Sequence, residues 1–207
     1  MGRKIIWICL ALACAAAAET VDRIAIIVNR RAVKDSDIDL DLRVTAFLNQ
    51  QAVAKSAAAR KESAQRLVDQ ALIREELDHG DYEAAPIAES QNLLSDLKKS
   101  RFSNDLAFRS ALKSHGISED DLKEKLFFQM TVLRFIDLRF KPGVLVSDDD
   151  IERYYNDHRQ QFRGSLEDSR DAIENTIEGE RVNQQLFDWL ARRRKTAKIV
   201  YREEELQ

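Results

Sequence analysis

The sequence predicts a mainly α-helical protein of about six helices, with a small sheet of two or three strands. Its 207 residues include only six Gly and two Pro, too few for the many tight turns of an all-β chain. Apolar residues recur three or four positions apart over most of the chain, as in amphipathic helices. Two β-branched runs, Val21–Val28 and Ala197–Tyr201, lie near opposite ends, and neither can satisfy its backbone hydrogen bonds alone. We therefore expect the mature N-terminus and the C-terminus to pair in one sheet.

The first eighteen residues have the pattern of a secretory signal peptide. Arg3 and Lys4 precede the apolar run Ile5–Ala15, and the small residues Ala16–Ala18 precede Glu19. The apolar run is shorter than the roughly 20 residues of a membrane-spanning helix, so no stable membrane span is expected. The pattern predicts export to the periplasm and cleavage after Ala18.

Both cysteines, Cys9 and Cys14, lie inside this predicted signal. Cleavage after Ala18 would remove them, so no disulfide and no thiol chemistry are expected. A lipoprotein acylated at Cys14 is the alternative. The formal net charge is −3, and losing Arg3 and Lys4 makes the chain more acidic, which argues against a nucleic-acid partner. We expect residues 19–207 to form a single domain.

Helical spacing recurs along this region in a regular order. After the strand Val21–Val28 and a second short run at Ala32–Val33, Ser36 or Asp37 can cap a helix that runs to about Lys55. The pairs His79-Gly80 and His115-Gly116 are typical helix ends. The expected helices cover residues 36–55, 57–79, 87–100, 104–114, 120–140 and 166–196, with a short one after Ser147.

Two of these helices have a clear apolar face. Ser118 and the acidic residues after it form a capping box for the helix 120–140. Its predicted buried face consists of Leu122, Leu126, Met130, Leu133 and Ile136. The long helix that follows Leu166 has a stripe that must be buried, and it leads into the last strand, so the segment 166–201 is expected to close the domain. That stripe consists of Ile173, Ile177, Val182, Leu186, Trp189 and Leu190.

No residue pattern indicates a catalytic, metal or cofactor site. His79, His115 and His158 are far apart, and two of them stand at helix ends. The triplet Asp148–Asp150 lacks the alternating ligands and central Gly of a calcium loop, and helix capping explains it. The sequence therefore predicts a protein that is not an enzyme.

Four segments together resemble one family. The strand region through Asn29 with Ser36–Asp39, then Arg66–Ile73, Phe140–Tyr155 and Leu186–Tyr201 are similar, in this order, to the SurA-type periplasmic chaperones. The resemblance covers the N-terminal domain of that family and its C-terminal helix and strand. It implies a helical chaperone core in which the two ends of the chain interlock.

One departure from the family limits what the resemblance implies. A parvulin-type prolyl isomerase domain of about a hundred residues, the size of an ordinary domain, usually follows the helix that here contains Tyr154 and Tyr155. In this chain only Arg163-Gly164-Ser165 separates Phe162 from Leu166. Isomerase activity is therefore not expected.

The resemblance predicts an ATP-independent holdase that binds unfolded envelope or outer-membrane proteins. Exposed aromatic side chains would bind such clients, and five candidates are Phe102, Phe108, Phe127, Phe128 and Tyr155. The alternative is a structural or regulatory subunit that docks on one dedicated partner or forms a homodimer by exchanging its terminal elements.

Overall fold

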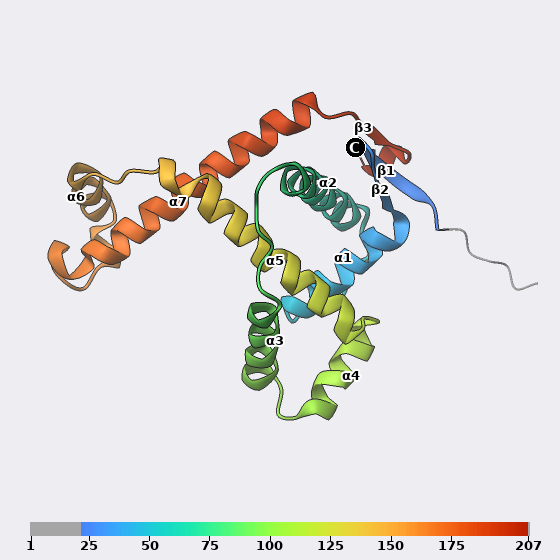
Figure 1. Cartoon of the computed structure of the whole chain (residues 1–207). Coiled ribbons are helices and arrows are strands. Elements are labelled where there is room, and N and C mark those ends of the chain that lie inside the picture. The colour runs from blue at the N-terminus through green and yellow to red at the C-terminus, as the bar shows by residue number, and fades with distance from the viewer. Residues whose placement is uncertain (1–21, 207) are drawn as a thin grey trace, which may run out of the picture.

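The computed structural model describes residues 22–206, so the predicted signal peptide and Cys14 lie outside the described residues. Within this range the chain forms seven α-helices and one three-stranded antiparallel sheet. The prediction of a mainly helical fold with a small sheet is confirmed (Figure 1). The elements are β1 (Ile24–Val28), β2 (Arg31–Lys34), α1 (Asp35–Leu48), α2 (Ala57–His79), α3 (Ile87–Arg101), α4 (Asp105–His115), α5 (Glu119–Arg139), α6 (Asp148–Asp157), α7 (Leu166–Thr196) and β3 (Ile199–Tyr201), with short 3₁₀ turns at Lys141–Gly143, Arg159–Gln161 and Glu204–Leu206.

The sheet joins the two ends of the described chain. β1 is its central strand, with β2 on one side and β3 on the other, both antiparallel to it. Ile26 lies opposite Tyr201, and Val28 lies opposite Ile199. The expected pairing between the N-terminal and C-terminal runs is therefore confirmed.

Asn29 ties this sheet to the helices. It stands in the turn between β1 and β2 with φ 53°, a left-handed conformation that Asn tolerates better than most residues. Its side-chain oxygen accepts a hydrogen bond of 2.8 Å from the backbone N–H of Lys198, and its amide nitrogen donates to Glu75 Oε2 at 2.7 Å. One side chain thus links the hairpin, the end of α7 and α2.

Three apolar clusters hold the helices together. The main cluster lies between the sheet, α2, the second half of α5 and the end of α7. A second joins the end of α1 with α3, α4 and the start of α5, and a third joins α6 to the start of α7. Figure 1 shows α3 with α4, and α6 with its end of α7, as separate projections from the centre.

The buried stripe of α7 is confirmed, and it serves two clusters. Ile173 and Ile177 pack in the α6 cluster, whereas Val182, Trp189 and Leu190 pack in the main cluster; Leu186 is partly buried against the latter. The helix therefore spans from one projection back to the sheet. After β3, the chain buries one more residue that the sequence analysis did not identify: Leu206 is 1% exposed.

The helix predicted to reach Lys55 ends earlier, at Leu48. Gln50 takes a left-handed φ of 55°, its N–H donates to Phe47 O, and the N–H of Gln51 donates to Ala46 O. This is the hydrogen-bond pattern of a Schellman motif. The prediction was wrong because the motif here uses Gln where Gly is the usual signal.

The predicted buried face of α5 is also wrong in part. Leu122 and Leu126 are buried as expected, but Leu133 is 54% exposed. Further along the helix the buried positions are Phe128, Thr131 and Phe135. The buried face rotates because α5 packs in the α3–α4 cluster with its first half and in the main cluster with its second.

The predicted helix caps are present. Ser118 and Asp121 cap α5, and Ser147 and Asp150 cap α6, each through reciprocal side-chain and backbone hydrogen bonds. The interpretation of Asp148–Asp150 as capping residues agrees with this geometry.

Candidate binding groove

The structure does not bring the five predicted aromatic residues to one site. Phe102 and Phe108 belong to the cluster of α1, α3 and α4, and Tyr155 belongs to the α6 cluster. Only Phe127 and Phe128, neighbours on α5, line a common hollow.

Phe108 is a core residue. Its side chain is 0% exposed, its ring lies edge-on to Phe47 and Phe102, and Lys98 Nζ lies 4.3 Å from its centre. Phe102 is partly buried and stacks on Phe47 with ring centres 5.9 Å apart. The prediction that Phe108 binds clients is therefore corrected, because its side chain is not accessible to a client.

Tyr155 holds the connection between α6 and α7. Its hydroxyl donates a hydrogen bond of 2.8 Å to the Gly164 carbonyl, and its ring stacks on Phe162 with centres 5.5 Å apart. These contacts give Tyr155 a structural role: it packs against the segment that connects α6 to α7.

Two adjoining hollows lie between α2 and α5. Phe127 lines one of them and Phe128 lines both, but only a small part of Phe128 is accessible, because this residue is 7% exposed and belongs to the main cluster. One hollow, of about 370 Å³, opens toward α1 and β2, and the other, of about 460 Å³, opens toward the loop after α2. The two share Arg74, Glu124 and Phe128, so we treat them as one feature, the α2–α5 groove. Apolar side chains on its walls are Leu40, Val44, Leu67, Ala71, Leu77, Ala84, Phe127 and Phe128.

A buried polar cluster at one end of the groove fixes the positions of α1, α2 and α5. The side chain of Asp41 on α1 is 3% exposed and lies 2.8 Å from both Lys125 Nζ and an Arg66 guanidinium nitrogen. Ser63 donates a further hydrogen bond to it at 2.9 Å. We call these four residues the Asp41 network. Burial by itself would raise the pKa of Asp41, but the two cations outweigh it and hold that pKa below its ordinary value.

Most of the other charges in the groove also have partners within the chain. Asp37 accepts a hydrogen bond from the backbone N–H of Lys34, and Asp121 caps α5. Arg31 pairs with Asp78 across the mouth. These side chains are occupied in holding the groove walls.

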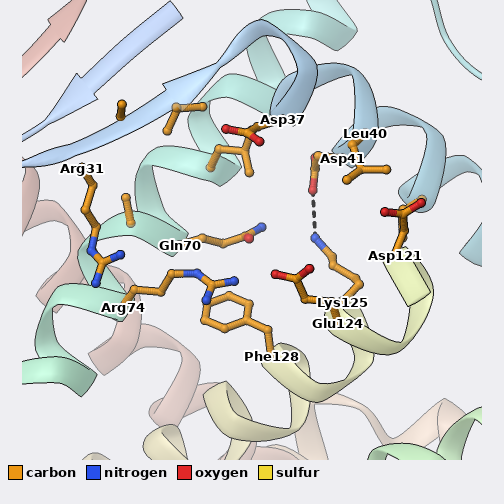
Figure 2. A pocket seen from close by; sticks show the side chains of 15 residues that line it. Arg31, Asp37, Leu40, Asp41, Gln70, Arg74, Asp121, Glu124, Lys125 and Phe128 are labelled. Atoms are coloured by element: carbon orange, nitrogen blue, oxygen red, sulfur yellow. Dashed lines mark hydrogen bonds and ion pairs between the residues drawn. The ribbon is translucent and has the colours of Figure 1, made fainter. Parts of the chain in front are cut away.

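Three polar side chains in the centre are different. Gln70, Arg74 and Glu124 make no side-chain hydrogen bond or ion pair with any residue in the range 22–206. Figure 2 shows them converging beside Phe128, with the Arg74 guanidinium over the ring at 3.9 Å. We call them the groove trio. Burial lowers the pKa of Arg74, and Glu124 partly opposes that shift, yet an arginine remains charged at neutral pH.

Sequence reasoning identified two aromatic residues of this groove and missed the groove trio. Gln70 and Arg74 are four residues apart on α2, and Glu124 precedes Phe128 by four on α5. Residues four apart share a helix face, so these polar positions lie beside buried apolar ones. The spacing of four could have indicated that each pair shares one helix face. It does not show that this face of α2 lies opposite this face of α5.

The described part of the chain shows no arrangement typical of a metal site or of a membrane span. No group of three His, Cys, Asp or Glu side chains in residues 22–206 is placed to hold a metal ion. None of the helices in that range is both long and apolar enough to cross a bilayer. The three histidines each direct Nδ1 to a backbone carbonyl four residues earlier, at Glu75, Ala111 and Tyr154.

Comparison with known protein families and with curated proteins finds no match to this chain. The groove and its residues therefore carry the functional argument.

Proposed function

We propose that the protein is an ATP-independent chaperone of the SurA type without an isomerase domain, which holds unfolded envelope or outer-membrane proteins in the periplasm. The observation that supports this most directly is the α2–α5 groove. It combines apolar walls with three polar side chains that have no partner among residues 22–206.

The dimensions of the groove suit a short segment of an unfolded chain. Each hollow falls within the range of about 300–1,000 Å³ that small ligand sites occupy, and the two adjoin. Contacts over so small a surface give weak binding, because ordering a flexible client offsets much of the gain. Weak binding permits release without a nucleotide.

A second candidate is a subunit that docks on a dedicated partner, including a homodimer formed by exchange of β3. β3 is three residues long and completes a sheet that begins at the other end of the described chain. Exchange of such an element between two copies costs little. Sedimentation of the purified protein tests it: a tight dimer without affinity for unfolded chains would replace the holdase proposal.

Light scattering tests the holdase proposal directly. A denatured outer-membrane protein is diluted into buffer with the purified protein, and near-stoichiometric amounts should suppress its aggregation. Ala84→Trp should reduce the suppression, because this exposed alanine lines the groove and a larger side chain would fill it.

Ala172→Trp is the matched control. Ala172 is an exposed residue of α7 in the α6 projection, so the same change should leave the suppression intact. Unchanged aggregation with the folded wild-type protein would reject the holdase proposal. Equal suppression by the wild-type protein and Ala84→Trp would place client binding outside the groove.

A further inference from the structure

The groove trio is electrically balanced. In the hollow that opens toward α1 and β2, every other charged side chain has a partner: it belongs to the Asp41 network, to a helix cap or to the Arg31–Asp78 pair. What remains is one cation, Arg74, one anion, Glu124, and the neutral amide of Gln70. Arg74 and Glu124 act on each other through space but do not form an ion pair within 4 Å.

This balance argues against a ligand of net charge. A carboxylate that paired with Arg74 would lie near Glu124, and an ammonium that paired with Glu124 would lie near Arg74. A peptide group avoids both conflicts, because its carbonyl accepts hydrogen bonds and its N–H donates one. The Gln70 side chain can do either, since an amide both donates and accepts.

Building on the proposed function, we infer that the groove trio binds the main chain of an extended client segment. Arg74 donates to a client carbonyl, Glu124 accepts from a client N–H, and Gln70 bonds a neighbouring peptide group. Hydrogen bonds with one ionised partner are about twice as strong as neutral ones. Recognition of this kind is independent of the client sequence.

The position of the trio supports this assignment. Arg74 and Glu124 belong to both hollows, so a main chain that crosses between them places flanking side chains against apolar walls on each side. The Phe128 ring lies 3.9 Å beneath the Arg74 guanidinium and limits its orientations. A planar guanidinium held in this way loses less entropy when it binds a carbonyl.

Fluorescence anisotropy with a pair of peptides tests the inference. The parent probe is a short, dye-labelled peptide of uncharged residues, capped at both ends, and its partner has the same side chains with N-methylated peptide groups. Arg74→Ala and Glu124→Ala should each raise the Kd of the parent about tenfold, as expected for one lost charge-assisted hydrogen bond. The methylated peptide should bind the wild-type protein more weakly, and Glu124→Ala should not weaken it further.

Two control variants separate main-chain binding from general charge effects. Arg163→Ala and Glu174→Ala remove one cation and one anion from exposed positions around the α6–α7 connection, and both should bind the parent peptide with wild-type affinity. Circular dichroism melts of all variants check that a change in Kd does not reflect unfolding.

The outcomes distinguish this inference from the proposed function. If the parent peptide binds the wild-type protein and both groove variants equally, and methylation has no effect, the main-chain assignment is wrong while the groove survives. If only peptides with acidic or basic side chains bind, the trio recognises charge instead, and the inference is also overturned. If no peptide binds and aggregation is not suppressed, the proposed function itself fails.

Discussion

Asp41 and Lys125 of the Asp41 network line the same hollow as the groove trio, and the two groups differ in where their partners are. Asp41 has two cations and a hydroxyl within hydrogen-bond distance, all from α2 and α5. Arg74 lies about two helical turns further along α2 from Arg66, over the face of the Phe128 ring, and it makes no hydrogen bond or ion pair within residues 22–206 (Figure 2). A polar group whose partners are supplied by the fold stabilises the fold. One that lacks them, in a hollow large enough for a ligand, is available for binding.

The difference has an energetic basis. Removing one member of a buried, fully bonded cluster leaves the other charges buried and unpaired, which is costly. Removing a side chain that has no partner leaves nothing unsatisfied. Variants of the two clusters should therefore separate stability from client binding. Substitutions at Asp41 and Arg74 test this directly, and substitutions at Phe108 and Asp150 add structural residues outside the groove; they follow from the largest expected change in stability to the smallest.

Phe108→Ala should lower the free energy of unfolding by about 3–5 kcal/mol, because it opens a cavity in a fully buried site. Urea denaturation followed by circular dichroism measures this. The residual folded protein should bind the parent peptide with unchanged affinity. A loss of peptide binding in a fully stable variant would restore Phe108 as a client-binding residue.

Asp41→Ala should cost about 2–4 kcal/mol, since it leaves Arg66 and Lys125 without their shared partner and both cations are only partly exposed. The urea midpoint reports the change. Asp39→Ala on the same helix is the control: this carboxylate is largely exposed, so its pair with Arg60 should contribute less than about 1 kcal/mol. Equal costs for the two variants would show that the Asp41 network is not a structural anchor.

Asp150 should make stability sensitive to acid. Hydrogen bonds from the backbone N–H and hydroxyl of Ser147, together with Arg181, lower its pKa from 3.8 to about 2. A carboxyl with a lower pKa in the folded state stabilises the fold above its unfolded pKa, and that contribution is lost as the pH falls from about 4 to about 2. Urea midpoints across this range should fall less steeply for Asp150→Asn than for the wild-type protein.

Glu124→Gln is a comparison variant at neutral pH, because Glu124 makes no bond to another residue of the described range. Its urea midpoint at neutral pH should equal that of the wild-type protein. A clearly lower midpoint would indicate that this carboxylate helps to stabilise the fold.

Arg74→Ala should have the smallest effect on stability, less than about 1 kcal/mol, because its main contact is the face of Phe128. Peptide affinity should nevertheless fall about tenfold. Urea denaturation and anisotropy on the same preparation measure both. A large loss of stability with unchanged peptide affinity would show that Arg74 stabilises the fold and does not bind the client.

The sequence by itself determined most of the local elements and the buried stripe of α7, but only the first half of the buried face of α5. Ser118 and Ser147 start helices because their hydroxyls accept backbone N–H groups, and the stripe of α7 must pack because it is apolar at helical spacing. Even the joining of the chain's two ends followed from local chemistry, because two isolated strands each need a partner. The end of α1 at Leu48 escaped prediction because the left-handed Gln50 that follows it carries no compositional signal.

The tertiary structure alone decided which side chains share a site. Phe102, Phe108 and Tyr155 look like Phe127 and Phe128 in the sequence, but packing places the first three in two other clusters. Phe127 and Phe128 line the groove, although Phe128 is also buried in the main cluster. The groove trio comes from two helices about fifty residues apart in sequence, and whether a polar side chain has a partner depends on distances in space. Periodicity places a residue on a face of its helix, and only the packing of helices determines what that face meets.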